Sequence, residues 1–445
     1  MKRIVVLGAA ESGVGAAILA KQKGFEVFVS DMGKIKEHYK AMLDSHGLEW
    51  EEERHTEALI LSADEVIKSP GIPDTAPMVM KLQECGIPII SEIEFAARYT
   101  DARMVCITGS NGKTTTTSWI YHTLKNAGFN VGLAGNIGHS LALQVAEGKH
   151  DCYVIELSSF QLDNMYEFRA NVAVLLNITP DHLDRYDFCM QNYVDSKMRI
   201  LRNQTAADSF IYWAGDEYVG AERGKYDVPS VNYPFTDAPT DEAEAYVDGE
   251  LLVVRRPVAF TMPISEISLV GKHNLRNAMA TALACLSAGA DVEAVRRGLS
   301  SFPGVEHRLE RVRTVGGVHY INDSKATNVD ACYCALDSMT TPVVLIVGGR
   351  DKGNDYSVLR DMVARKCRAL VYLGADNGKL HESFDEIGLP VADTHSMRDC
   401  VEACVRFAQE GDTVLLSPCC ASFDLFKNME DRGEQFMQLV RALPQ

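Results

Sequence analysis

The sequence predicts a three-domain α/β protein, with a Rossmann-like domain at each end and a central parallel-sheet domain between them. A β-branched apolar run followed by a glycine-rich turn occurs three times, in "RIVVLGAAESGVG" from Arg3, "MVCITGSNGKTTTT" from Met104 and "PVVLIVGGRDKG" from Pro342. This pairing is typical of a buried parallel strand that feeds a loop, so three occurrences indicate three sheets. The length of 445 residues agrees, because at about 150 residues per domain it accommodates three domains.

The alternation of strand-like and helix-like segments sets the expected domain boundaries. From the first turn it continues through "FEVFVSD" to "IPIISEIEFAARY", which predicts a first domain over residues 1–98. The second domain, 99–303, contains a polar, loop-rich stretch near 214–250 and an apparent long helix in "GKHNLRNAMATALACLSAGA". The Pro-Gly break in "FPGVEHR" marks a linker, after which the alternation resumes in a third domain, 304–445.

The first glycine turn is a weak dinucleotide fingerprint. Gly8 and Gly13 occupy the outer positions of G-x-G-x-x-G, but Ala10 replaces the middle glycine that lets the backbone approach a pyrophosphate. Asp31 ends the next strand, where an acid commonly meets a ribose or a base. The alternative is a plain tight turn with a capping acid. A hydride-transferring dehydrogenase is a second alternative, but it leaves the second domain unexplained.

The second glycine turn is a shortened phosphate-binding loop, T-G-S-N-G-K-T. The usual P-loop has a glycine five residues before Gly112, where this chain has Ile107. The shorter loop still contains the groups that bind phosphate and Mg²⁺. Backbone N–H groups of residues 109–113 and the start of the following helix favour phosphate, Lys113 neutralises the β/γ oxygens, and Thr114 can bind Mg²⁺. The sequence therefore predicts a central P-loop ATPase domain that binds ATP.

Two further strands of the central domain end in groups that can bind a metal. Glu156 ends the strand "YVIE", and Asp181 with His182 follows "NITPDH". Parallel strands deliver such side chains to one edge of a sheet, beside the phosphate loop. We therefore expect Glu156 to share a Mg²⁺ with Thr114 and His182 to lie near a second ion.

Composition excludes several classes of protein. Lys and Arg number 44 against 61 Asp and Glu, and this net charge of −17 argues against nucleic acid as a partner. The opening "MKRIVVLGAA" imitates a signal peptide, but Glu11 ends its apolar run, and no membrane-spanning stretch follows. Twelve cysteines without a regular framework indicate reduced core thiols. We expect a soluble cytoplasmic protein, monomeric and without a membrane partner.

A set of motifs in consistent order resembles the Mur ligase family over nearly the whole chain. The motifs are "TGSNGKTTTT", "IELSSFQL", "NITPDHLDRY", "YVDSKMRI", "GKHNLRNA", "FPGVEHRLE", "INDSKATN" and "SPCCASFDLFKNMEDRG". The glycine loop is shared with folylpolyglutamate synthases, whereas "ELSSFQL", "INDSKATN" and "SP-x-CAS" point to the D-glutamate-adding branch. The resemblance implies ATP-dependent ligation of D-glutamate to UDP-N-acetylmuramoyl-L-alanine through an acyl phosphate, in peptidoglycan precursor synthesis. It also implies an N-terminal domain for the UDP end and a C-terminal domain that binds the amino acid and closes over ATP.

Matching the family's motifs residue by residue assigns the site. Catalytic roles fall to Lys113, Glu156, His182 and Lys197, and metal binding to Thr114, Glu156, His182 and Lys197, with Lys197 carbamylated by CO₂. ATP contacts are expected at Gly109, Ser110, Asn111, Gly112, Lys113, Thr114, Thr115, Asn274, Asn277, Arg308, Asp323 and Lys325. The resemblance implies contacts with the UDP end of the substrate at Glu11, Ser12, Asp31, Met32, Ser69 and Gly71, and with its muramoyl arm at Asn136, Ser158 and Gln161. It implies contacts with the amino acid at Thr327, Lys352, Ser422 and Phe423. Met429 departs from the family, which has an aromatic residue after "FKN".

Other functions stay open on the sequence alone. A regulatory or transport NTPase would use the phosphate loop and release phosphate without a UDP-sugar or an amino acid. Another Mur-type ligase that adds a different amino acid, or a ligase like folylpolyglutamate synthase, would share most of the motifs. Phosphate release that depends on one amino acid of a panel would distinguish them.

Overall fold

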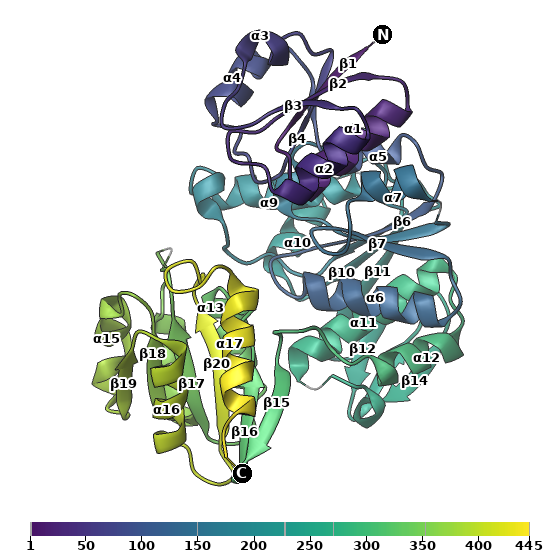
Figure 1. Cartoon of the computed structure of the whole chain (residues 1–445). Coiled ribbons are helices and arrows are strands. Elements are labelled where there is room, and N and C mark those ends of the chain that lie inside the picture. The colour runs from purple at the N-terminus through teal and green to yellow at the C-terminus, as the bar shows by residue number, and fades with distance from the viewer. Residues whose placement is uncertain (1, 149, 227, 270, 352, 445) are drawn as a thin grey trace. The chain divides into compact units, whose positions relative to one another are not determined.

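The computed structural model describes residues 2–148, 150–226, 228–269, 271–351 and 353–444. The chain forms two compact units. The first runs to Ser268 and includes Asn274–Phe302, and the second comprises Leu269–His273 and the chain from Pro303 onward. Figure 1 shows three α/β layers along the chain, coloured from purple through teal to yellow.

The first sheet is parallel, with strand order β3-β2-β1-β4-β5. Its strands are β1 (Arg3–Leu7), β2 (Glu26–Ser30), β3 (Glu49–Glu51), β4 (Glu65–Lys68) and β5 (Ile89–Ile90), and its helices are α1 (Glu11–Gln22), α2 (Glu37–Ser45), α3 (Glu57–Ile60), α4 (Pro77–Glu84) and α5 (Glu92–Ala97). Side chains alternate along β1, so Ile4 and Val6 pack in one core with α1 while Val5 and Leu7 pack in another with α4. The strand order reverses between β1 and β4, where ligands bind in open sheets of this kind.

The second sheet has nine strands in the order β14-β13-β12-β11-β10-β9-β6-β8-β7. They are β6 (Arg103–Thr108), β7 (Val131–Gly135), β8 (Cys152–Glu156), β9 (Val172–Leu175), β10 (Ser209–Trp213), β11 (Val231–Thr236), β12 (Ala245–Asp248), β13 (Leu251–Val254) and β14 (Phe260–Pro263). Strands β6 to β12 pair in parallel, and β12 to β14 form antiparallel hairpins. The expectation of a loop-rich stretch near 214–250 was wrong in part, because α10 (Glu217–Arg223), β11 and β12 lie there.

Helices cover the central sheet. They are α6 (Lys113–Asn126), α7 (Leu141–Glu147), α8 (Ser159–Leu162), α9 (Met190–Met198), α10 (Glu217–Arg223), α11 (Lys272–Ala288) and α12 (Val292–Ser301), with 3₁₀ turns η1 (Leu183–Arg185), η2 (Arg199–Leu201) and η3 (Ile264–Glu266). The buried Trp119 fixes α6 against α12, because its indole N–H donates to Gly298 O and its ring stacks on Phe302 at 5.2 Å. The long helix predicted from "GKHNLRNAMATALACLSAGA" is α11.

The third sheet has six strands in the order β15-β16-β20-β17-β18-β19. They are β15 (Glu310–Val315), β16 (Val318–Asn322), β17 (Val343–Gly348), β18 (Cys367–Leu373), β19 (Val391–Thr394) and β20 (Thr413–Cys419). Helices α13 (Val329–Asp337), α14 (Arg360–Lys366), α15 (Gly378–Phe384), α16 (Met397–Phe407) and α17 (Met429–Arg441) surround them, with turns η4 (Ser357–Leu359) and η5 (Asp385–Ile387). Among the described strands of this third sheet, only the β15–β16 pair is antiparallel.

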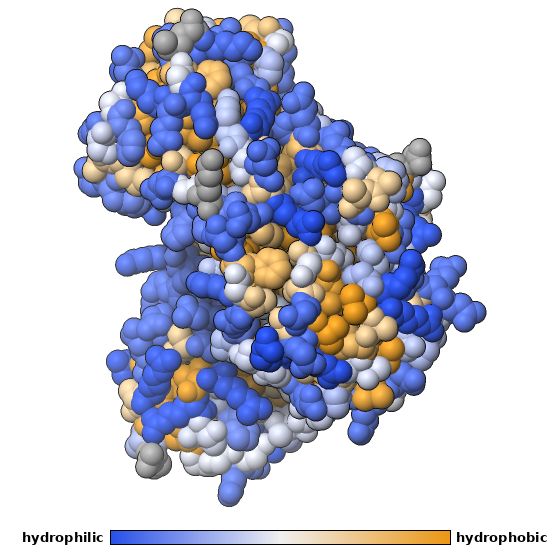
Figure 2. Space-filling model, turned by 90° about the vertical axis from the view of Figure 1, so that its right-hand side faces the viewer, coloured by the Kyte–Doolittle hydropathy of each residue, from blue (hydrophilic) through white to orange (hydrophobic). Residues whose placement is uncertain are grey.

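The three sheets confirm the predicted α/β fold class, while the domain boundaries at 98/99 and 303/304 stay predictions. None of the twelve cysteines, all within the described residues, forms a disulfide, and most are buried, as the sequence predicts. Figure 2 shows one face covered mainly by hydrophilic residues, with apolar residues in scattered groups. Within the described ranges, every helix is too short or too polar to span a bilayer.

Candidate active site

The glycine loop lies between β6 and the first turn of α6. Gly109 and Gly112 adopt φ angles of +148° and +86°, and a Cβ on Gly112 would lie 2.7 Å from the side-chain oxygen of Asn277. Both positions therefore require glycine. The N–H groups of Ser110 and Asn111 donate to the main-chain and side-chain oxygens of Asn177. The main-chain N–H groups at the start of α6, which have no partner within the helix, are therefore the groups that would bind an anion.

Asn177 is a residue that the sequence reasoning did not single out. It follows the end of β9, the strand beside β6, and its side chain accepts from Asn111 N at 2.8 Å and donates to Asn111 O at 3.0 Å. A polar residue at the carboxyl end of a buried strand was the signal that could have identified it.

Two lysines converge on one carbonyl of this loop. Lys113 Nζ donates to Gly109 O and Ser110 O, each at 2.8 Å, and Lys197 Nζ donates to Gly109 O at 2.9 Å. Lys197 is only 1% exposed. Burial, and next the charge of Lys113, hold the pKa of Lys197 well below its ordinary value. The environment therefore favours the neutral amine.

Glu156 supplies a buried carboxylate beside these lysines. It is 1% exposed at the end of β8, and its Oε1 accepts from Asn136 Nδ2 at 2.8 Å. Its Oε2 is buried without a hydrogen-bond partner in the described part of the chain. A buried carboxylate oxygen of this kind is costly unless a cation or a donor completes it. Thr114, buried in the first turn of α6, provides a second oxygen of the type that Mg²⁺ prefers.

His182 lies in the loop after β9, in a left-handed conformation with φ of +53°. Its Nε2 is 3.5 Å from Asp181 Oδ2, and its ring meets Phe160 edge-on at 5.3 Å. Among the residues that the structure describes, no three His, Cys, Asp or Glu side chains form a ready-made metal cluster. The predicted metal set differs from such a cluster because it includes a threonine and a lysine, and its role stays a prediction.

Helix α11 brings the two predicted adenine-side residues to the glycine loop. Asn277 Oδ1 accepts from Thr116 Oγ1 at 3.2 Å, and Asn277 Nδ2 donates to Asn274 Oδ1 at 3.2 Å. The side chain of Asn277 thus packs against Gly112 of the phosphate loop.

The predicted muramoyl-side residues are split between two roles. Asn136 follows β7 and contacts Glu156 through both its main chain and its side chain. Ser158 and Gln161 instead form a reciprocal capping box at the start of α8, with Ser158 N donating to Gln161 Oε1 at 2.9 Å. The Ser158 hydroxyl and the Gln161 side-chain oxygen are engaged in this box, and a substrate contact from the two residues stays a prediction.

The residues predicted to hold the UDP end lie at the carboxyl ends of β1, β2 and β4. Asp31 accepts from Ala9 N and Gly33 N, each at 2.7 Å, so its carboxylate fixes the glycine turn and the loop after β2. Ser69 lies directly against Gly8, whereas Met32 is 62% exposed. These residues and their neighbours Ser12 and Gly71 share one edge of the sheet.

Glu11 turns away from that edge. Its Oε1 accepts from Ser140 N at 3.3 Å and lies 3.3 Å from His139 Nδ1, both at the start of α7. An acid at this position of the glycine turn would repel a diphosphate, and these contacts direct it toward the N-terminus of a central-domain helix instead.

In the second unit, the predicted ATP residue Arg308 lies just before β15, and Asp323 and Lys325 follow β16. Asp323 is 3% exposed and accepts from Ser417 Oγ at 2.9 Å and Leu309 N at 3.2 Å. Burial raises the pKa of Asp323 to about 6, against the opposing charge of Arg308. Arg308 Nε is buried without a partner among the described residues. Lys325 and Thr327 lie on the same turn.

The predicted amino-acid contacts Ser422 and Phe423 follow β20. Ser422 is 2% exposed and its main-chain oxygen accepts from Leu425 N and Phe426 N, whereas Phe423 is 65% exposed. Lys352, the third predicted contact, lies outside the described residues. An exposed aromatic ring at the carboxyl end of a buried strand is available to a ligand.

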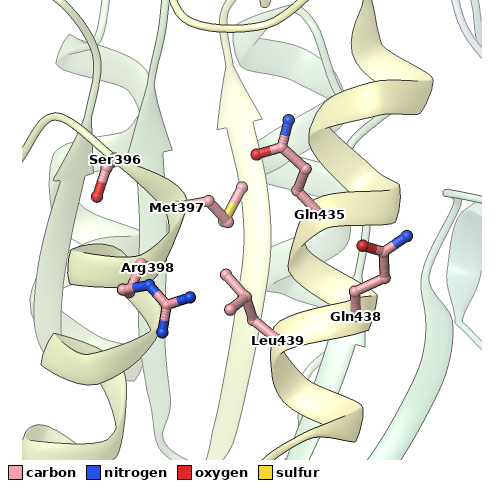
Figure 3. Close-up of a pocket in the computed structure, with 6 residues that line it drawn as sticks. All are labelled: Ser396, Met397, Arg398, Gln435, Gln438 and Leu439. Carbon is pink, nitrogen blue, oxygen red and sulfur yellow. The ribbon is translucent and has the colours of Figure 1, made fainter.

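A pocket of about 370 Å³ lies between α16 and α17, lined by Ser396, Met397, Arg398, Gln435, Gln438 and Leu439 (Figure 3). None of these residues is a predicted contact. Ser396 is occupied as the N-cap of α16, and Gln435 and Gln438 each donate to an acid one helical turn earlier.

Three family models match the chain. They are the MurD N-terminal domain over residues 3–78, the Mur ligase middle domain over 107–285, and the Mur ligase, glutamate ligase domain over 307–420.

Relatives match over the full length. UDP-N-acetylmuramoylalanine--D-glutamate ligase of Bacteroides fragilis is 62% identical over 444 residues and covers 100% of both chains. The protein of the same name from Porphyromonas gingivalis is 56% identical, covering 99% of this chain and 98% of its own.

Solved structures share the fold at low identity. UDP-N-acetylmuramate-alanine ligase MurC from Thermotoga maritima has a TM-score of 0.63 at 18% identity and covers 99% of both chains. MurF ligase from Thermotoga maritima, in complex with ADP, has a TM-score of 0.60 at 16% identity and covers 93% of both.

Proposed function

The chain belongs to the Mur ligase family, and we propose that it joins D-glutamate to UDP-N-acetylmuramoyl-L-alanine, driven by ATP, as a step of peptidoglycan precursor synthesis. The observation that carries the proposal is the full-length identity of 62% to a relative with that name. The peptidoglycan role in turn implies a bacterial cytoplasm, and we expect the enzyme to act as a monomer.

The reaction forms an amide in two steps. A carboxylate oxygen of the substrate attacks the γ-phosphorus of ATP, the bond to the β-γ bridging oxygen breaks, and ADP leaves. The neutral amine of D-glutamate then attacks the acyl carbon and loses a proton, and phosphate departs. Neither step needs a protein nucleophile, so catalysis rests on holding the phosphate in line and compensating its charge.

Two sets of residues would bind ATP. In the first unit, the start of α6 and Lys113 would face the phosphates, with Asn277 and Asn274 toward the nucleoside. In the second unit, Arg308, Asp323 and Lys325 are the further residues expected to contact ATP. The partnerless Nε of Arg308 supports this role, because a buried donor without an acceptor is rare unless a ligand supplies one.

The residues present fit a magnesium ion. Thr114 and Glu156 would hold it, with His182 near a second ion and Lys197 beside both, and the orphaned Oε2 of Glu156 supports the first assignment. When bound, the ion would neutralise charge on the phosphate oxygens. Lys197 would take part as a carbamate, formed when its neutral amine attacks CO₂ and loses a proton. The buried amine next to Lys113 favours this form, because a neutral lysine keeps the lone pair that the attack needs.

Each end of the precursor would meet a different part of the chain. The UDP end would lie against the edge that carries Gly8, Asp31 and Ser69, at the switch point of the first sheet. The D-glutamate would lie against the loops of the third sheet that carry Thr327, Lys352, Ser422 and Phe423. Met429 begins α17 where the family has an aromatic residue, and it changes one wall of that region.

Amino-acid-dependent release of phosphate tests the proposal. The purified enzyme is incubated with ATP, Mg²⁺ and UDP-N-acetylmuramoyl-L-alanine, and a panel of amino acids is added one at a time. D-Glutamate alone should stimulate release, whereas L-glutamate, glycine, L-alanine and L-lysine should not. Stimulation by another member of the panel would identify a Mur-type ligase of different specificity, and release without the UDP precursor would contradict the proposal.

A further inference from the structure

Three loops meet at one edge of the third sheet. Strand β20 is the last in the chain, yet it lies between β16 and β17, the first two parallel strands of this sheet (Figure 1). The described residues that follow these strands are 323–328, 349–351 with 353–356, and 420–428. The carboxyl ends of neighbouring parallel strands at such a switch point are where ligands bind.

The loops after β17 and β20 are in contact through their main chains. Arg350 N donates to Ala421 O at 2.8 Å. Gly349 adopts a φ of +128°, and a Cβ there would lie 2.4 Å from Ala421 O. A displacement of one of these loops would therefore move the other.

A buried tyrosine joins the same two loops through its hydroxyl. Tyr356, 3% exposed, donates to Asp351 Oδ2 at 2.7 Å, and its oxygen lies 3.1 Å from Cys420 Sγ. Asn354 Nδ2 donates to the same hydroxyl and to Cys419 O, each at 3.2 Å. Because the phenol has one proton and Asp351 receives it, the thiol and Asn354 are the groups that donate to the phenol oxygen.

Asp351 anchors this network on the other side. Its Oδ1 accepts from Gly353 N at 2.6 Å, Asn354 N at 3.2 Å and Lys379 Nζ at 3.1 Å. Burial alone would raise the pKa of Asp351, but these bonds and the one from Tyr356 hold the pKa below its ordinary value. The anion is thus a stable acceptor for the tyrosine.

Arg432 of α17 links the carbonyl of Cys420 to the loop after β16. Arg432, 1% exposed, donates through Nη1 to Cys420 O at 3.1 Å and through Nη2 to Ser324 O at 2.8 Å. Ser324 lies between two residues proposed to meet ATP. Cys420 is therefore fixed at its thiol by Tyr356 and at its carbonyl by Arg432.

We propose that Tyr356 is a positioning residue for the amino-acid site, because its hydroxyl ties Cys420 to Asp351 and so fixes the segment that presents Ser422 and Phe423. This inference rests on the proposed function, in which those two residues contact D-glutamate. Removing the hydroxyl leaves Asp351 Oδ2 without its donor and frees the thiol of Cys420. The amino-acid segment then loses the anchor at the Cys420 thiol, while the bonds from Arg350 N to Ala421 O and from Arg432 to Cys420 O remain.

Tyr356→Phe tests this role with little change in volume. With the full-length enzyme and saturating ATP and UDP-N-acetylmuramoyl-L-alanine, the KM for D-glutamate should rise about 5- to 10-fold, the effect expected of one buried hydrogen bond. The KM for ATP and for the UDP precursor should change less than about twofold. An unchanged KM for D-glutamate, or an equal rise in the KM for ATP, overturns the inference.

Tyr372→Phe is the matched control. Tyr372 is also fully buried in this sheet and its hydroxyl also donates to an aspartate, Asp385 Oδ1, at 3.2 Å. It lies in β18, which does not border β20. Thermal unfolding should show similar losses of stability for the two variants, whereas only Tyr356→Phe should alter the KM for D-glutamate. Equal effects of both variants on that KM would show a general loss of stability and overturn the inference.

A double-mutant cycle with Cys420→Ala tests whether Tyr356 acts on the amino-acid segment through the Cys420 thiol. The effects of Tyr356→Phe and Cys420→Ala on the KM for D-glutamate should be strongly non-additive, since both break the same link; additive effects overturn it. If Tyr356→Phe does not fold, Cys420→Ala is tested alone, and it should raise the KM for D-glutamate by the same factor. The wild-type enzyme is measured first. No response of the wild type to D-glutamate would refute the proposed function, whereas a normal wild type with unaffected variants refutes only this inference.

Discussion

Replacing Lys197 by alanine separates a chemical role of this lysine from a structural one. Its Nζ donates to Gly109 O at 2.9 Å, and the side chain is 1% exposed beside Lys113. A lysine buried against a second cation is unfavourable for folding, and burial is the main cause that depresses the pKa of its ammonium. A site of this kind is expected where function, rather than stability, requires the residue.

The magnitudes of the two effects differ enough to be told apart. Loss of the buried methylenes costs about 2–3 kcal/mol and loss of the hydrogen bond about 1 kcal/mol, while removal of the desolvated amine offsets part of both. The net loss of roughly 1–3 kcal/mol leaves a domain of ordinary stability folded. Loss of a charged ligand at the phosphate should instead lower the rate on the order of 10³-fold or more.

The assay is amino-acid-dependent phosphate release by Lys197→Ala, measured with and without a high concentration of acetate. Acetate should restore part of the activity by occupying the vacated anion site, and ¹³CO₂ should give a carbamate NMR signal in the wild type that the variant lacks. Lys366→Ala is the control, because Lys366 Nζ also donates to carbonyls, those of Leu336, Asp337 and Met339, yet lies away from the predicted site. It should lose stability but keep its activity. Activity of Lys197→Ala within about tenfold of the wild type would refute the reasoning.

Three further predictions concern the first unit. Lys113→Ala should lower ligase turnover on the order of 10³-fold, because the phosphoryl charge loses its compensation, with little change in the melting temperature; turnover near that of the wild type would contradict its role. Glu156→Gln should abolish the Mg²⁺ dependence together with most of the activity while the free energy of unfolding stays equal or rises, since an orphaned buried carboxylate is removed; a clear loss of stability would argue against this. Burial raises the pKa of Glu92 from 4.5 to about 7, so the folded state holds this proton more tightly, and the stabilisation is complete below about pH 4.5 and is lost as the pH rises to about 7. Between these pH values, urea unfolding should show that the free energy of unfolding of the wild type falls by roughly 3 kcal/mol more than that of Glu92→Gln. The same dependence on pH in both proteins would contradict the raised pKa of Glu92.

The sheets could be predicted from sequence because their signal is local. A β-branched run and the glycine turn that ends it lie within about a dozen residues, so β1, β6 and β17 were recognisable. Strands β11 and β12 were missed. Pro234 interrupts the run of β11, where proline usually argues against a strand, and β12 is short and flanked by polar residues.

The site also has a part that is local in sequence and could be predicted, and a part that only the fold brings together. Gly109 to Thr114 form one contiguous loop whose chemistry follows from its residue types, so the sequence could predict it. The contact of Asp31 with the ligand stays a prediction, and the alternative of a capping acid also fits, since its two oxygens hold Ala9 N and Gly33 N. The sequence could not show that the fold brings a glycine turn 22 residues earlier against this carboxylate. The link from Tyr356 to Cys420 spans 64 residues and depends on β20 entering the sheet beside β17, which no local pattern indicates.

The central claim is that ATP activates the substrate's carboxylate, and transfer of ¹⁸O tests it most directly. UDP-N-acetylmuramoyl-L-alanine with ¹⁸O in both oxygens of its carboxylate is incubated with ATP, Mg²⁺ and D-glutamate, and the released phosphate is analysed by mass spectrometry. The account predicts one ¹⁸O atom in each phosphate and the other in the new amide, because the attacking oxygen leaves with the phosphoryl group. Phosphate without ¹⁸O would mean that water, not the carboxylate, attacks the γ-phosphorus, and would contradict the account.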